Sequence, residues 1–211
     1  MKKQTVKYNN IEYDSKEEVE FVMWLEEAKN IGFVQHYKYQ PVEIQAIPRK
    51  TYRESIQLKT KVKTIDKFLL HPLTYTPDFE IIFDEYFFKC FDSGIIRVLN
   101  LRKMSFPDMD DLIDTNSLII YADVKGEYNL KNHHRIFSLT QKIVYDKTGY
   151  FINMIIPEKF FKRTWVPEGC AFMKNRLEPT RRKAYKDCKL LSEFDVISSY
   201  PNNKPEIILD A

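Results

Sequence analysis

Four side chains in three short segments of this chain have the types and spacing of a divalent-cation site. Three are the carboxylates of Glu18, Asp78 and Asp123, and the fourth is the amine of Lys125. Because successive residues of a strand point to opposite faces, Asp123 and Lys125 share a face if they lie on a strand. Three crowded carboxylates cannot all stay ionised beside one another unless a cation offsets their charge. We therefore expect a bound metal or raised pKa values.

Such a site has the groups that phosphodiester hydrolysis requires. The reaction needs a water that is nucleophilic near neutral pH and a cation that stabilises charge on phosphorus. Mg²⁺, or Mn²⁺ in its place, provides both when carboxylates hold it. We expect Asp78, Asp123 and the main-chain carbonyl of Val124 to bind the ion, and Glu18 to hold a second metal position directly or through water. Lys125 would contact the scissile phosphate and orient or deprotonate the attacking water.

Each segment also has an ordinary structural explanation. Ser15-x-x-Glu18 is a capping box, in which Glu18 would only satisfy backbone N–H groups. Asp78 could be a turn residue, and Asp123-Val124-Lys125 could be a strand end with a solvated ion pair. What favours the catalytic interpretation is that all three segments occur together, each on the type of element that the chemistry requires.

The elements that must carry these residues can be read from the periodicity of apolar residues. A helix is expected over residues 16–30, with Asp14 or Ser15 as its N-cap and Gly32 just beyond its end. At about 100° per residue, Glu18 falls in the apolar sector of this helix. The other glutamates of the helix fall outside that sector: Glu17, Glu20, Glu26 and Glu27.

Strands are expected from Asp78 onward, over Leu118–Lys125 and over Tyr150–Ile156, with a helix from His133 to about Asp146. The order strand, helix, strand favours an α/β fold, with a right-handed crossover and helices on both sides of a central mixed β-sheet. Residues 84–117 are longer than a normal strand connection and are interpreted as an insertion. We assign residues 1–157 to the core and residues 158–211 to a basic C-terminal extension.

The net charge of +3 hides two strongly basic stretches, residues 49–67 and 174–189. The first could be a hairpin arm or a mobile loop, because its alternation of apolar and polar residues is weak. Such clusters suit a polyanionic partner, and binding through them should weaken with salt. The expected DNA contacts are Arg49, Lys50, Arg53, Lys59, Lys61, Lys63, Lys142, Arg181, Arg182 and Lys183.

Composition excludes several other classes of protein. Apolar residues make up 44% of the chain, enough for a core, yet no run approaches the roughly 18–20 apolar residues that span a bilayer. The chain begins with polar residues rather than an apolar stretch, so no signal peptide is expected. Cys90, Cys170 and Cys188 are odd in number and widely spaced, which favours a reducing compartment. We expect a cytoplasmic protein without a membrane partner.

Pro77-Asp78 and Asp123-Val124-Lys125 resemble the two halves of the motif that defines the PD-(D/E)xK nuclease superfamily. Residues 74–79, Thr-Tyr-Thr-Pro-Asp-Phe, are similar to the corresponding segment of the phage endonuclease I family of Holliday-junction resolvases. That family places a helix glutamate ahead of the pair, as Glu18 is placed here. The resemblance implies a restriction-endonuclease-like core and Mg²⁺-dependent cleavage of branched DNA by a homodimer. It also implies a role in DNA recombination and a phage or mobile-element origin, with a location in the host cytoplasm if the protein is phage-encoded.

Two alternatives remain open. Tyr39-Gln40-Pro41 also resembles a segment of the restriction-like transposase subunits that cleave transposon ends, and such a nuclease would need a protein partner. A nuclease fold can also serve as a catalytically silent module that binds DNA or protein, with residues 84–117 as its contact surface. The four intact site residues argue against the silent module, because binding alone would not need all of them.

Overall fold

The computed structural model describes residues 5–84, 117–126, 130–172 and 182–193. At its centre lies a four-stranded sheet with the strand order β10-β9-β8-β3. The strands are β3 (Val34–Tyr39), β8 (Phe79–Asp84), β9 (Ser117–Val124) and β10 (Ile152–Ile155). β8 pairs antiparallel with both β3 and β9, whereas β10 pairs parallel with β9. The sheet is therefore mixed, as predicted.

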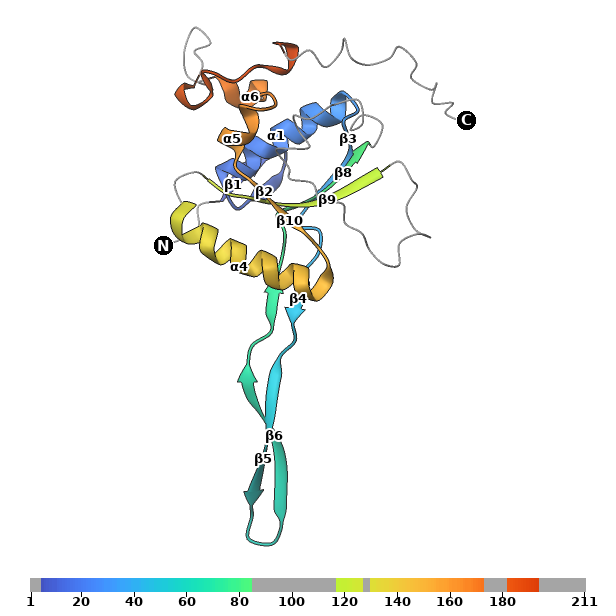
Figure 1. The fold of residues 1–211 in the computed structure, drawn as a ribbon, viewed down its shortest axis with the longest axis vertical. Coiled ribbons are helices and arrows are strands. Elements are labelled where there is room, and N and C mark those ends of the chain that lie inside the picture. The colour runs from blue at the N-terminus through green and yellow to red at the C-terminus, as the bar shows by residue number, and fades with distance from the viewer. Residues whose placement is uncertain (1–4, 85–116, 127–129, 173–181, 194–211) are drawn as a thin grey trace, which may run out of the picture.

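Helices cover both faces of this sheet (Figure 1). On one face lie α1 (Lys16–Asn30), α5 (Pro157–Phe161) and α6 (Glu168–Ala171), and on the other lies α4 (Leu130–Thr148). α4 connects β9 to β10, and a crossover of this kind is what two parallel neighbouring strands require. The prediction of an α/β chain is confirmed at this level.

Helix α1 has the predicted bounds, with Ser15 as its N-cap and Gly32 at a φ of 80° just beyond its end. The helix is buried more fully than its periodicity indicates. Glu20, which was expected outside the apolar sector, is only 5% exposed. The prediction was wrong because the C-terminal part of the chain packs on this second side of α1.

The core consists of two clusters, one on each face of the sheet. The larger contains the alternate β8 residues Phe79, Ile81 and Phe83, which pack with the aromatic side chains of α1. The smaller cluster lies on the α4 side of the sheet and contains Tyr121 and Val144. This division follows from the period of two along each strand, which sends alternate side chains to opposite faces.

The long connection between β8 and β9 begins and ends at neighbouring points of the sheet. Asp84, the last residue of β8, pairs with Ser117, the first residue of β9. Residues 85–116, which make up most of the predicted insertion, lie outside the described residues.

A long two-stranded arm extends from the α4 side of the sheet (Figure 1). It is made of the antiparallel pairs β4–β7 and β5–β6. The bounds are β4 (Ile44–Ile47), β5 (Lys50–Gln57), β6 (Val62–Leu70) and β7 (Leu73–Tyr75). Of the two alternatives for the basic stretch 49–67, the hairpin arm is the one observed.

Both ends of the described chain contribute to the layer that contains α1. A short hairpin, β1 (Val6–Tyr8) and β2 (Ile11–Tyr13), precedes the helix. Two short 3-10 helices, η2 (Lys183–Tyr185) and η3 (Leu191–Glu193), follow α6. Side chains from residues 160–191 pack in the same cluster as α1, among them Trp165 and the buried free thiols Cys170 and Cys188. Among the described residues, no helix has the length and apolar character to cross a membrane.

Candidate functional site

The pairing of β8 with β9 brings Asp78 and Asp123 together across a long stretch of sequence. Phe79 lies opposite Ala122, so the next pair in this register is Asp78 and Asp123. The backbone N–H of Val124 donates to Asp78 Oδ2 at 2.7 Å, which fixes that carboxylate against the end of β9. Asp123 is only 3% exposed.

Lys125 lies beside both carboxylates. Its Nζ is 2.8 Å from Asp123 Oδ2 and 3.9 Å from Asp78 Oδ2. The predicted common face of Asp123 and Lys125 is thus present. Burial lowers the pKa of Lys125, but the charges of Asp123 and Asp78 outweigh that effect and hold the pKa above its ordinary value. The amine is therefore protonated at neutral pH and can bind an anion, whereas it cannot accept a proton in this arrangement.

The acidity of Asp78 departs strongly from that of an ordinary carboxyl group. Burial and the charge of Asp123 raise the pKa of Asp78 to about 8, while Lys125 and the Val124 N–H oppose the shift. Without a cation, Asp78 therefore holds its proton at neutral pH, and Lys125 pairs with the one remaining charge, on Asp123. A divalent cation would allow both carboxylates to ionise.

Glu18 lies close enough for its charge to raise the pKa of Asp78 further, but its carboxylate is engaged by its own neighbours. Oε2 accepts hydrogen bonds from the Asp14 N–H at 3.0 Å and the Tyr39 hydroxyl at 2.8 Å. Oε1 accepts from the Ser15 hydroxyl at 2.9 Å. In the described part of the chain, no three His, Cys, Asp or Glu side chains form a group that could hold a metal ion. The predicted capping role of Glu18 is therefore present.

Tyr39 and Gln40, at the end of β3, also contribute to the site. Tyr39 binds Glu18, and the backbone N–H of Gln40 donates to the Asp78 carbonyl at 2.8 Å. Gln40 has a φ of 44°, a left-handed conformation that costs a non-glycine residue free energy. The segment Tyr39-Gln40-Pro41 was noted in the sequence only as a resemblance, and its hydrogen bonds depend on a backbone conformation that residue types do not reveal.

Tyr75 was not predicted as a site residue. Its hydroxyl is buried. Burial raises the pKa of Tyr75, and the charges of Asp123 and Asp78 and a polar contact with the Asp123 side chain raise it further, so the hydroxyl lies near both carboxylates.

Oxygen atoms are the donors that Mg²⁺ and Mn²⁺ require, so the residues present fit such an ion. Asp78 and Asp123 supply carboxylate oxygens. A strand residue turns its N–H and C=O toward the same neighbouring strand, so the Val124 carbonyl faces the side on which Asp78 lies.

The residues expected to bind DNA lie in three places. Six of them are on or beside the β5–β6 hairpin: Arg49, Lys50, Arg53, Lys59, Lys61 and Lys63. Lys142 is exposed on α4, and Lys183 is exposed in η2. Arg182 instead directs its guanidinium inward, with Nη1 2.6 Å from Glu20 Oε1. Arg181 lies outside the described residues.

Comparison with protein-family models, with curated proteins and with solved structures gives no match for this chain.

Proposed function

We propose that this protein is a metal-dependent endonuclease that hydrolyses phosphodiester bonds in DNA. The observation that supports this most is the meeting of Asp78, Asp123 and Lys125 at the adjacent ends of β8 and β9. Two adjacent carboxyl groups that can both ionise only beside a cation, together with a protonated amine, form a site for a cation and a phosphate.

In this proposal, Asp78, Asp123 and the Val124 carbonyl hold Mg²⁺ or Mn²⁺. The ion supplies Lewis-acid stabilisation of the phosphate and lowers the pKa of water. Lys125 binds a non-bridging oxygen of the scissile phosphate through its ammonium group. Glu18, held by Tyr39 and Ser15, orients water at the edge of the site rather than binding the ion directly.

The proposed fold is a restriction-endonuclease-like core, and the proposed substrate is branched DNA cut by a homodimer. The basic β5–β6 arm supports a DNA partner, since this lysine- and arginine-containing ribbon extends well away from the sheet (Figure 1). The buried free thiols of Cys170 and Cys188 suit the reducing cytoplasm that we propose as its location.

A cleavage assay on supercoiled, linear, single-stranded and four-way-junction DNA tests this proposal. We expect Mg²⁺-dependent cutting, with the junction cut fastest. Asp78→Asn and Lys125→Ala should each lower cutting by at least about 100-fold while DNA binding stays largely intact. Asp84→Asn, the same chemical change at the other end of β8, is the matched control and should cut normally. Normal cutting by both site variants would refute the assignment.

The second candidate is a nuclease subunit that works only with a protein partner. The exposed surface of α4 favours it, because Ile136 and Leu139, three residues apart on the helix, are each more than half exposed. Adjacent exposed apolar side chains of this kind fit a surface that another protein covers. In that case the isolated protein would bind DNA in the same assay but leave all four substrates uncut.

A further inference from the structure

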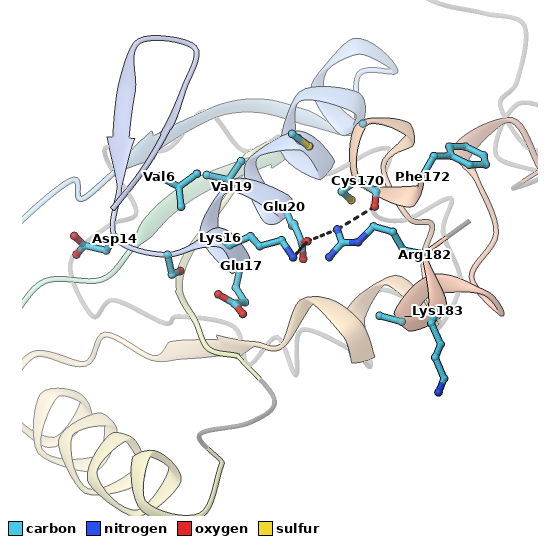
Figure 2. A pocket seen from close by; sticks show the side chains of 14 residues that line it. Val6, Asp14, Lys16, Glu17, Val19, Glu20, Cys170, Phe172, Arg182 and Lys183 are labelled. Carbon is cyan, nitrogen blue, oxygen red and sulfur yellow. Dashed lines mark hydrogen bonds and ion pairs between the residues drawn. The ribbon is translucent and has the colours of Figure 1, made fainter. Parts of the chain in front are cut away.

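A pocket of about 960 Å³ lies between β1, the first turns of α1 and the segment that contains α6 and η2 (Figure 2). Apolar side chains line much of it, including Val6, Val19, Met23 and Phe172. Its volume falls within the range of about 300–1,000 Å³ that is usual for ligand sites. The proposed catalytic residues do not line it, so it needs an explanation of its own.

The pocket directly adjoins the candidate metal centre. Ser15 lines the pocket, and its hydroxyl donates to Glu18 at 2.9 Å. Glu17 also lines the pocket, and its carboxylate lies against Gly126, where an added Cβ would be 3.1 Å from Glu17 Oε1. Gly126 follows Lys125 directly in the sequence. A strand whose phosphate reaches Lys125 would thus pass the mouth of this pocket.

The charges around the pocket balance one another. Its lining contains three acidic residues and three basic ones: Asp14, Glu17, Glu20, Lys16, Arg182 and Lys183. Figure 2 shows Arg182 between Glu20 and the carbonyl of Cys170, with Lys16 directed toward the same glutamate. A phosphate gains no net attraction in such a place. The fitting ligand is a flat, neutral group that carries hydrogen-bond donors and acceptors at its edge.

We propose that this pocket binds an unpaired nucleobase of the DNA strand next to the scissile phosphate. The inference rests on the proposed nuclease function, because that function brings the strand to this point. Phe172, half-buried in the lining, offers an aromatic face for stacking, and Val19 and Met23 offer apolar surface. Glu17 offers an acceptor for the edge of the base. A base can enter only after leaving its own stack, so unpaired nucleotides bind best.

Binding of short single-stranded DNA in EDTA tests this proposal without any cutting. The probes are a labelled oligothymidylate and an abasic strand of equal length, which carries the same phosphates without bases. We expect the wild-type protein to bind the base-carrying strand about 5- to 150-fold more tightly, the range that one stacked base provides. Fluorescence anisotropy gives both dissociation constants.

Two variants assign that preference to the pocket. Ala184 is exposed and lines the pocket, so Ala184→Trp should block it and bring the ratio of the two constants close to one. Phe172→Ala should lower the ratio by removing the stacking surface. In both variants the affinity for the abasic strand should stay unchanged. Ser192→Trp adds the same side chain in η3, outside the pocket, and should keep the wild-type ratio.

Equal binding of the two strands by the wild-type protein would overturn the proposal, and this result needs no variant. Such equality is also the result expected if the pocket receives a side chain of a protein partner. A base preference that survives Ala184→Trp in a folded protein, checked by thermal melting, would overturn it as well. Mg²⁺-dependent cutting of plasmid DNA is measured separately. A protein that cuts without base preference loses only the pocket assignment, and one with the preference that never cuts loses only the nuclease assignment.

Discussion

At the scale of single residues, the surroundings of one carboxyl group, that of Asp78, disfavour its charged form. Asp78 is held against β9 by the Val124 N–H and lies beside Asp123, and its pKa is raised to about 8 by burial and by that neighbour. A carboxyl group whose surroundings disfavour its charged form is typical of a functional site. Residue types and spacing predicted that Asp78, Asp123 and Lys125 lie together, and these side chains do meet at the ends of β8 and β9, while their catalytic role stays a prediction.

This acidity predicts how stability depends on pH. Between the ordinary pKa of 3.8 and about 8, folded Asp78 holds a proton that the unfolded chain has lost. Its contribution to stability is therefore full below pH 3.8 and is lost as the pH rises toward 8. In EDTA, Asp78→Asn should melt about 5 °C above the wild type at pH 9, and by a smaller margin at pH 5.

Thermal melting of both proteins across this pH range provides the measurement. Asp84→Asn, on the same strand, corrects for the general effect of removing one negative charge. A difference in melting temperature between the wild type and Asp78→Asn that does not grow with pH would show that the pKa of Asp78 is not raised in the folded protein.

At the scale of elements, helices and strands were predicted correctly where apolar residues recur with a clear period, and were missed or left open where they do not. The bounds of α1 agree with the prediction, and β9 and α4 lie within a few residues of it. β1 and β2 were not predicted, because strands of three residues are too short for alternation to appear. The β5–β6 hairpin is exposed on both faces, so it has no apolar side and its sequence could not separate an arm from a loop.

The arm carries a prediction about salt. Lys59, Lys61 and Lys63 are exposed at its far end, with no acidic residue among them. If they contact phosphates, changing all three to Gln should weaken DNA binding and reduce the slope of log affinity against log salt by about 2–3. Binding measured over a series of salt concentrations gives this slope.

The control changes three exposed lysines of the opposite layer to Gln: Lys29, Lys159 and Lys162. It lowers the net charge equally, so long-range attraction changes by a similar amount in both proteins. Equal slopes for the two triple variants would exclude the arm as the DNA contact.

At the scale of the whole molecule, the C-terminal part of the chain completes the surroundings of α1. Arg182 and Tyr185 both donate to the buried carboxylate of Glu20, and Trp165 donates to Glu27 at 2.9 Å. The periodicity of residues 16–30 could not predict these contacts, because the partners lie far away in the sequence. For the same reason, Arg182 looked like a surface cation within a basic run.

Loss of this contact should affect stability more than DNA binding. Arg182→Ala leaves the buried carboxylate of Glu20 with the exposed Lys16 as its remaining cation, which should cost about 2–3 kcal/mol and lower the melting temperature by roughly 5–10 °C. Lys183→Ala, at the exposed neighbouring position, should leave the melting temperature almost unchanged. Equal melting temperatures for the two variants would show that the ion pair does not hold the C-terminal segment on α1.

Calorimetric titration of the wild-type protein with Mn²⁺ at pH 7, in two buffers of different ionisation heat, tests the account most directly. Because the pKa of Asp78 is about 8, we expect binding to release close to one proton, and Asp123→Asn should weaken it by at least about tenfold. Unchanged affinity in Asp123→Asn, or no binding by the wild type at millimolar Mn²⁺, would contradict a cation site between these carboxylates.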